Sequence, residues 1–202
     1  LELIHEASRW TLPGFEARLG AGRLHGNASL TAENSVPWQG PWSGQVQVER
    51  VDPARLWNGL APGQLDGELL ARAEQAGADA FAATFSGRLR NTAPTALRRA
   101  AQALPVDELV LQGRWQAPVN APARGQLQLE QLALRAFGLQ LDGQGRLDLS
   151  THELQGDVKA RAPGWFGSWS GLADAARGQG QIRLDLTDAD ASLAWLRSLQ
   201  TA

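Results

Sequence analysis

Apolar residues fall at every second position in many short runs of this chain, and the clearest runs lie within residues 125–162. Leu127 and Leu129 form one such pair, with glutamines between and beside them, and Leu147 and Leu149 form another. A period of two is typical of a β-strand that has one apolar and one polar face. The pattern therefore predicts a meander of amphipathic antiparallel strands.

The alternation changes parity at two places in this region. One shift lies between Leu129 and Leu132, and the other lies between Leu134 and Leu139. A shift of one residue would move every following leucine to the opposite face of the sheet. Each place is therefore predicted to hold a β-bulge or a turn.

Other parts of the chain show the same period. Pro13-Gly14 is a turn signal that predicts two short strands in residues 1–19, and the Trp- and Gly-rich segment 163–171 is predicted to be a loop. Residues 65–73 and 81–89 are expected to form a hairpin around Gly77. The remaining predicted strands are 22–32, 42–48, 109–115 and 180–186.

Three segments favour helix. Asp52 can cap a short helix over residues 53–60 that starts with Pro53, and Asp188 can cap a helix over residues 189–200. Residues 95–104 favour helix by residue propensity.

These elements predict an all-β fold, mainly antiparallel, in which an elongated sheet curls around an apolar interior and carries two or three short helices. We expect residues 1–202 to form a single β-rich segment, with a candidate internal boundary near 117–124, where Pro118 and Pro122 interrupt the pattern. The chain begins Leu-Glu-Leu, so we expect it to come from a longer protein whose export signal or anchor lies elsewhere.

The composition narrows the classes of function. The chain has no cysteine, which excludes disulfides, thiolate catalysis and cysteine-ligated metals. The formal net charge is −2, and no basic stripe favours a nucleic-acid partner. No apolar run approaches the roughly 20 residues that a membrane-spanning helix requires.

Candidate catalytic chemistry is also sparse. His5, His25 and His152 lie far apart in the sequence, without the spacing of a metal site. Most acidic residues occupy the outward, alternate positions of strands, and no Gly-x-Ser-x-Gly motif is present. We therefore expect no enzyme activity, no cofactor and no metal.

The apolar strand face is the feature that remains, and it allows two interpretations. It could be the packed core of a β-sandwich, or it could line an open groove, because the glycines and alanines among the leucines leave space. Half-burying a 16-carbon acyl chain in such a groove would contribute about 6 kcal/mol, at about 0.8 kcal/mol per methylene. The predicted lining is Val46, Val48, Leu69, Phe85, Leu109, Leu111, Leu127, Leu129, Leu139, Leu141, Leu147, Leu149, Val158, Ile182 and Leu184.

Several phrases of the sequence resemble the periplasmic region of the TamB family and its AsmA-like relatives. They are the repeated Gly-x-Leu-x-Leu strands, the Asp-Pro-initiated segment Val51–Trp57, and the Leu-Pro phrase Leu104–Trp115 that ends in Gly-Arg-Trp. The resemblance implies a β-taco, which is a sheet folded lengthwise into an apolar half-pipe.

The same resemblance carries expectations about function. It implies a periplasmic segment of a protein anchored in the inner membrane of a Gram-negative bacterium, with the anchor outside this chain. It also implies phospholipid acyl chains as cargo, transport between the two membranes, and support of outer-membrane protein assembly with an Omp85-type partner. The family has no catalytic residues to transfer to this chain.

Two further interpretations remain open. The chain could be a chaperone-like scaffold that binds outer-membrane β-strands at an open sheet edge without carrying lipid. It could also be a carbohydrate-binding sandwich whose stacking platform comes from Trp38, Trp42, Trp165 and Trp169.

Overall fold

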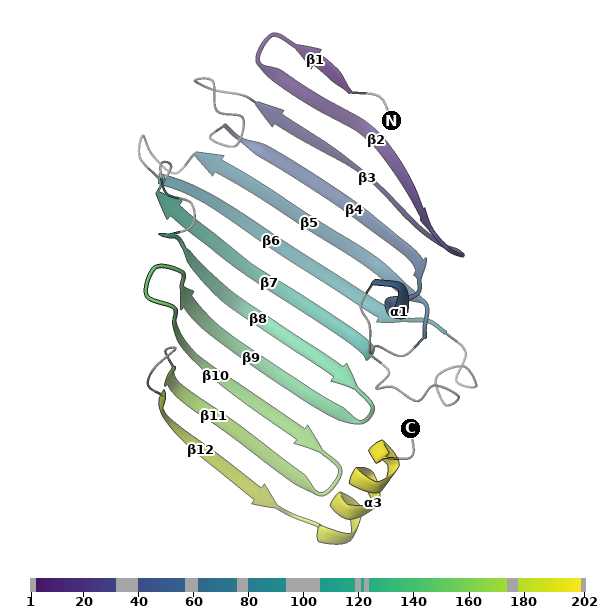
Figure 1. The fold of residues 1–202 in the computed structure, drawn as a ribbon, viewed down its shortest axis with the longest axis vertical. Helices are drawn as coiled ribbons and strands as arrows, with labels where there is room; N and C mark the ends of the chain where they lie inside the picture. The colour runs from purple at the N-terminus through teal and green to yellow at the C-terminus, as the bar shows by residue number, and fades with distance from the viewer. Residues whose placement is uncertain are drawn as a thin grey trace.

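The computed structural model describes residues 3–31, 40–56, 62–75, 80–93, 106–118, 121, 124–173 and 178–200. Twelve strands pair in their sequence order to form one open antiparallel sheet (Figure 1), as the all-β expectation required. The strands are β1 (Ile4–Glu6), β2 (Arg9–Leu19), β3 (Gly22–Thr31), β4 (Trp42–Val51), β5 (Leu65–Gln75), β6 (Ala80–Asn91), β7 (Val106–Pro118), β8 (Gln126–Ala136), β9 (Leu139–Asp148), β10 (Glu153–Ala162), β11 (Trp165–Ala173) and β12 (Gly178–Leu186).

Both parity shifts have the predicted structural causes. The register of β8 against β9 shifts between Leu129 and Leu132, which is a bulge that returns Leu132 to the face of Leu129. The second shift is the turn between β8 and β9, where Phe137 and Gly138 adopt positive φ angles of 49° and 78°. The leucines on either side of each irregularity therefore share one face.

Two local predictions were wrong. Pro13 and Gly14 do not end a strand, because a register irregularity between Leu12 and Phe15 accommodates them within β2. The segment predicted to be a loop, residues 163–171, contains most of β11. Its glycines and tryptophans alternate with period two and pair with both β10 and β12, so they belong to a strand.

Two of the three predicted helices lie at least partly in the described residues. Helix α1 (Pro53–Leu56) begins as expected, with the Asp52 carboxylate accepting from the Ala54 N–H at 3.2 Å. The rest of the predicted 53–60 helix and the whole 95–104 helix lie outside the described residues. Helix α3 (Ala189–Gln200) is capped by Asp188, whose carboxylate accepts from the Ala191 N–H at 2.9 Å.

The sheet continues past the candidate boundary at residues 117–124. Strands β7 and β8, which flank it, pair from Val106 opposite Ala136 to Gln116 opposite Gln126. In the described part of the chain no second sheet covers either face, so the packed-sandwich interpretation of the leucine pattern is not the fold adopted.

Burial is concentrated toward the two ends of the strands. Toward one end, Val48, Val51 and Leu65 form a cluster, in which Val51 is fully buried. Toward the other end, Ala73 and Phe81 belong to a second cluster with Ala83, against which tryptophans pack. We call these two clusters the margins of the sheet.

This distribution makes a prediction about stability. Val51→Ala should lower the free energy of unfolding by about 2 kcal/mol, because it removes two buried methyl groups and leaves a cavity. Ile182→Ala, at a side chain that is 82% exposed, should change the free energy by less than about 0.5 kcal/mol. Urea unfolding followed by tryptophan fluorescence measures both, and equal losses would contradict this account of the margins.

Candidate functional site

One face of the sheet, which we call the apolar face, carries no charged or polar residue other than tryptophan at the central positions of ten consecutive strands. The strand registers place three or four such positions from each strand in cross-strand rows. These positions are Leu24, Gly26, Ala28 and Leu30; Trp42, Gly44, Val46 and Val48; Gly67, Leu69, Ala71 and Ala73; Ala83, Phe85, Gly87 and Leu89; Leu109, Leu111, Gly113 and Trp115; Leu127, Leu129, Leu132 and Leu134; Leu141, Gly143, Gly145 and Leu147; Leu154, Gly156, Val158 and Ala160; Gly167, Trp169 and Gly171; Gly180, Ile182 and Leu184.

The structure brings nearly all the predicted lining residues onto this face. Thirteen of them occupy its cross-strand rows, and Leu139 follows on β9 with the parity of Leu141. Leu149 lies just beyond β9, where its N–H donates to the Gly125 carbonyl. The predicted lining omitted Trp115 and Leu132, although each continues an alternation recognised in the sequence, and it omitted Trp169, which lies in the segment predicted to be a loop.

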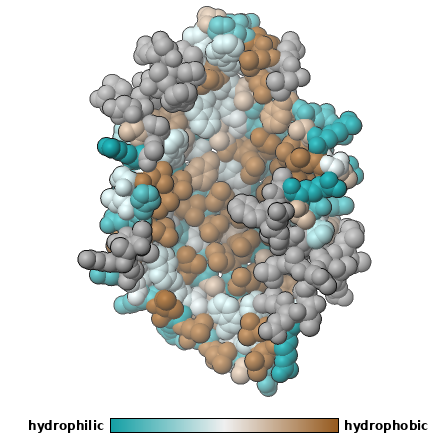
Figure 2. Space-filling view, in the orientation of Figure 1, coloured by the Kyte–Doolittle hydropathy of each residue, from teal (hydrophilic) through white to brown (hydrophobic). Residues whose placement is uncertain are grey.

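The middle of the apolar face is uncovered. Figure 2 shows hydrophobic residues gathered over the centre of this face, with hydrophilic residues along its sides. In the middle strands Leu69 is 41% exposed and Leu129 and Leu132 are half-buried, whereas on the edge strand β12 exposure reaches 82% at Ile182 and 70% at Leu184. Contiguous exposed apolar surface of this kind marks a binding surface more often than a monomer's ordinary exterior.

Large side chains on this face lie over glycines of the neighbouring strand. A Cβ built on Gly87 would stand 2.5 Å from Cδ2 of Leu69, and one on Gly113 would stand 2.5 Å from Cζ of Phe85. Those glycines provide the space that the adjacent side chains occupy. Alternation of large and small residues across strands therefore lets the curled face accept leucine and phenylalanine without crowding.

An apolar cavity of about 540 Å³ opens on this face at its N-terminal end, across β2 to β4. Trp10 and Trp42 form parts of its wall, and Gly44 leaves its floor free of a side chain. The His5 ring stacks on Trp10 at 4.0 Å between centroids. This cavity has the size of a small-ligand pocket and a lining suited to hydrocarbon.

Aromatic rings also line one margin of the face. Phe81 lies 6.4 Å from Trp42 and 5.2 Å from Trp115, as measured between ring centroids. The indole N–H of Trp115 is buried and has no hydrogen-bond partner among the described atoms. Trp165 lies outside this group, and its ring centroid is 6.0 Å from that of Trp195 on α3.

The tryptophans proposed as a carbohydrate platform do not come together. Trp42 lies on β4, whereas Trp165 and Trp169 lie seven strands away on β11. Trp38 is outside the described residues.

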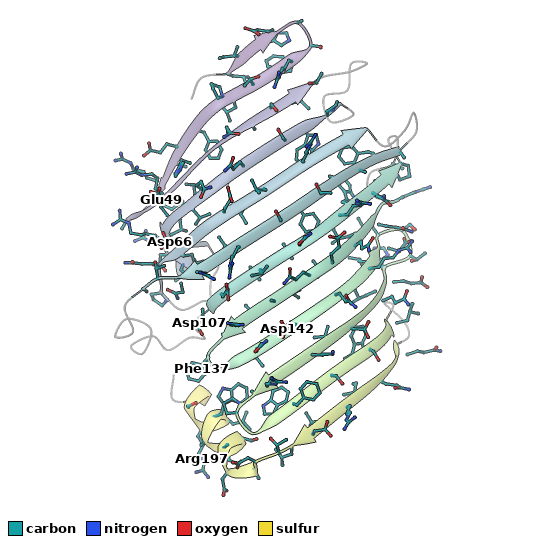
Figure 3. All side chains as sticks on the ribbon, turned by 180° about the vertical axis from the view of Figure 1, so that it is seen from behind. Glu49, Asp66, Asp107, Phe137, Asp142 and Arg197 are labelled. Carbon is teal, nitrogen blue, oxygen red and sulfur yellow. The ribbon has the colours of Figure 1, made fainter. Side chains whose placement is uncertain are left out.

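The opposite face is polar (Figure 3). Near the ends of β6, β7 and β8 on this face, Glu108 accepts from Arg88 at 2.7 Å and from Arg90 at 2.9 Å, and Arg135 approaches it at 3.7 Å. Hydrogen bonds from Arg88 and then Arg90 hold the pKa of the Glu108 carboxyl below its usual range. These contacts bridge β6, β7 and β8 and fasten the polar surface of neighbouring strands.

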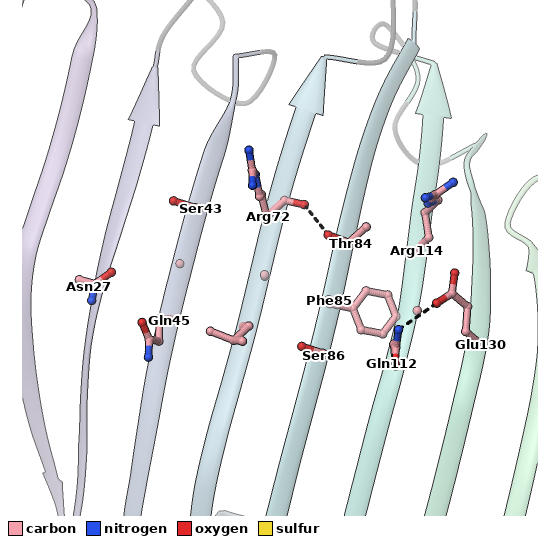
Figure 4. Close-up of a pocket in the computed structure, with 14 residues that line it drawn as sticks. Asn27, Ser43, Gln45, Arg72, Thr84, Phe85, Ser86, Gln112, Arg114 and Glu130 are labelled. Carbon is pink, nitrogen blue, oxygen red and sulfur yellow. Dashed lines mark hydrogen bonds between the residues drawn. The ribbon is translucent and has the colours of Figure 1, made fainter.

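A polar trough of about 580 Å³ crosses β3 to β8 on this face (Figure 4). Several of its polar side chains already have hydrogen-bond partners: Gln112 donates to Glu130 at 3.2 Å within the trough, and the Ser43 hydroxyl lies 3.0 Å from that of Ser29 beside it. The Thr84 hydroxyl donates to the Arg72 carbonyl at 3.5 Å. This mutual satisfaction is typical of a solvated sheet surface, so the trough is a weaker candidate than the apolar face.

The described residues contain no group of three histidine, aspartate or glutamate side chains that could hold a metal ion. Within the same residues, no helix has the length and apolar character needed to cross a membrane. Comparisons with protein-family models, curated proteins and solved structures found no match to this chain. The geometry of the two faces is therefore what bears on function.

The apolar cavity predicts the effect of filling its floor. A Cβ on Gly44 would meet only ordinary contacts, the nearest being the Asn27 carbonyl oxygen at 3.8 Å, so Gly44→Leu should fold. The variant should bind the uncharged dye N-phenyl-naphthylamine about tenfold more weakly, because losing an apolar contact area equivalent to roughly two methylene groups costs about 1.6 kcal/mol. Fluorescence titration measures this change.

Gly14→Leu is the matched control. Gly14 also lies in a strand, and a Cβ placed on it would have nothing within 4 Å, but it does not line the cavity. Unchanged dye affinity in Gly44→Leu, or an equal loss in Gly14→Leu, would contradict binding at this cavity.

Asp148 makes a prediction about pH. Its carboxylate accepts from the Ser150 hydroxyl at 2.6 Å, the Ser150 N–H at 2.9 Å and Gln126 at 3.1 Å, and these hydrogen bonds hold its pKa well below the usual range. A lowered carboxyl pKa stabilises the fold above the unfolded-state pKa of 3.8, and this contribution is lost as the pH falls further. Asp148→Asn should therefore be less stable than the wild type at pH 7, with a difference that shrinks on acidification below about pH 4. Urea midpoints across this pH range provide the test, and a difference independent of pH would refute it.

Proposed function

We propose that this chain is a segment of a groove protein that shields phospholipid acyl chains on its apolar face during transport between two membranes. The observation that carries the proposal is the uncovered centre of the apolar face, which continues across ten strands without a charged side chain. The rows run across the strands, so the apolar surface extends along the length of the sheet (Figure 1).

The chemistry of the face favours hydrocarbon over polypeptide. A peptide laid over its centre would bring N–H and C=O groups that find no polar side chain there, and each unsatisfied group costs several kcal/mol. An acyl chain has no such groups along its length. At about 0.8 kcal/mol per buried methylene, partial burial would retain a chain and still permit it to move or leave.

The resemblance to the TamB family supplies the proposed setting. We place the segment in the periplasm of a Gram-negative bacterium, as part of an inner-membrane-anchored protein that cooperates with an Omp85-type partner and supports outer-membrane protein assembly. The curled sheet with an apolar interior is the fold that this resemblance implies, and it supports the proposal at the level of architecture.

The scaffold alternative also has one observation in its favour. Strand β12 ends the sheet, and among the described residues its outer edge pairs with no other strand. A scaffold of this kind would capture strands at that edge and leave the apolar face without lipid.

Photocrosslinking separates the two functions. A benzophenone amino acid would replace Leu129 or Leu132, which flank the β8 bulge on the apolar face, with the chain directed to the periplasm of a Gram-negative host. Gln128 and Gln131 are matched controls, since each is one residue away and exposed. We expect phospholipid adducts, identified by mass spectrometry after irradiation, at the leucine positions and only background at the glutamine positions.

A folded protein without lipid adducts at Leu129 and Leu132 would reject the conduit. Equal adduct yields at all four positions would also reject it, because they would indicate non-specific contact with membranes. Circular dichroism of each purified variant establishes that the sheet is intact.

A further inference from the structure

The two edges of the sheet differ in how they are protected. At the N-terminal edge, β1 has only three residues, and the irregularity at Pro13 interrupts β2. Short edge strands, proline and bulges are devices that block pairing with another chain. Strand β12 has none of them: it runs nine residues from Gly178 to Leu186 and pairs with β11 in unbroken register.

Helix α3 directly follows β12 but turns away from its open edge. The Trp195 indole donates to the Phe137 carbonyl at 2.8 Å, and the Ser192 hydroxyl donates to the Pro163 carbonyl at 3.3 Å. These acceptors lie in the turns that follow β8 and β10, so α3 lies beside the ends of the preceding strands (Figure 1). The outer edge of β12 stays uncovered by the helix.

The side chains of β12 are the most exposed large apolar groups of the sheet. Ile182, Leu184 and Leu186 are 82%, 70% and 64% exposed. On the other face, Arg183 and Asp185 pair with each other at 2.8 Å. A strand added outside β12 would bury the apolar groups and would pair with the backbone groups of this edge that bind no strand among the described residues.

We propose that β12 pairs with β12 of a second copy of this chain, antiparallel and in register about Ile182, so that two apolar faces join into one. A two-fold axis at Ile182 places Gly180 opposite Leu184 of the second copy on both sides of the axis. This is the arrangement found within the sheet itself, where a Cβ on Gly167 would lie 3.7 Å from Cδ1 of Leu184.

The polar face is compatible with the same register. Arg183 falls opposite Gln181 of the second copy, and Asp185 falls opposite Gln179, so no like charges meet across the interface. A register centred one residue later would oppose Arg183 to itself, which is unfavourable. The two-fold interface is closed, and it therefore predicts a dimer with no tendency to form fibres.

The absence of cysteine in the chain makes the interface easy to test. In an antiparallel pair the two Ile182 Cα atoms would be about 4.5–5.5 Å apart, within the range that a disulfide spans. Ile182→Cys should therefore give a disulfide-linked dimer under mild oxidation without lipid. Leu154→Cys is the control, because Leu154 is 42% exposed on the same face but lies two strands from the edge.

Sedimentation velocity provides the second arm, using the unmodified 202-residue chain and two lysine variants. The wild type should sediment at twice the 21.7 kDa monomer mass. Leu184→Lys should sediment as a folded monomer, because a charged side chain on the apolar face of the edge strand β12 opposes pairing with a second copy. Leu154→Lys should remain dimeric.

A monomeric wild type at hundreds of micromolar would overturn the proposal, as would equal crosslinking of Leu154→Cys and Ile182→Cys. If the chain is monomeric but its β12 edge binds a synthetic peptide with alternating apolar and polar residues, the proposal would also be overturned. The partner of that edge would then be a strand of a different protein. All measurements are made without lipid, so their outcome is independent of the acyl-chain proposal.

Discussion

The backbone hydrogen-bond ladder between consecutive strands is the interaction on which the rest of this protein depends. The described residues include ten buried hydrophobic residues, and six of them are alanines, so side-chain burial contributes little per residue. A two-layer fold would bury a whole face of each sheet, whereas here the pairing of twelve strands in sequence order supplies the continuity. Such a sheet can leave one face open because its integrity does not require a covering layer.

The rows of the apolar face show how the sheet tolerates curling. Where a large side chain such as Leu69 or Phe85 projects from one strand, a glycine often faces it on the next. At Gly145 and Gly156 the two strands come so close that a Cβ on either residue would stand within 3.4 Å of the other's Cα. Glycine therefore permits the close approach, although its flexibility disfavours strands in general.

Much of the architecture was predictable from the period of the leucines. The bulge between Leu129 and Leu132 and the turn before Leu139 followed from parity alone, because a strand cannot change faces without an irregularity. The β11 segment was misassigned because its glycines and tryptophans suggest a loop by composition, whereas their alternation carries the strand signal. Residue type and residue spacing gave opposite answers there, and spacing was correct.

The openness of the sheet could not be predicted from the sequence. A leucine that packs against a second sheet and a leucine that faces an open groove produce the same alternation, so the pattern around Leu129 fits either arrangement. The unprotected edge was equally hidden, since β12 reads like any interior strand until its neighbours are known. The open face and the unpaired edge both depend on which other elements pack beside a residue, and the local sequence pattern does not contain that information.

The buried margins are separate from the centre of the apolar face, and this separation affects which substitutions the protein can tolerate. Burial at Val51 and Phe81 stabilises the strand ends, while the central rows around Leu69 and Leu132 hold apolar side chains that remain partly exposed. Substitutions in the centre should thus alter what the face binds at small cost in stability, provided that the ladder and the facing glycines are kept. A packed core would not permit this, because there each methyl group serves stability and shape together. The open sheet assigns those two roles to different residues, which is the arrangement that the proposed hydrocarbon-binding surface would need.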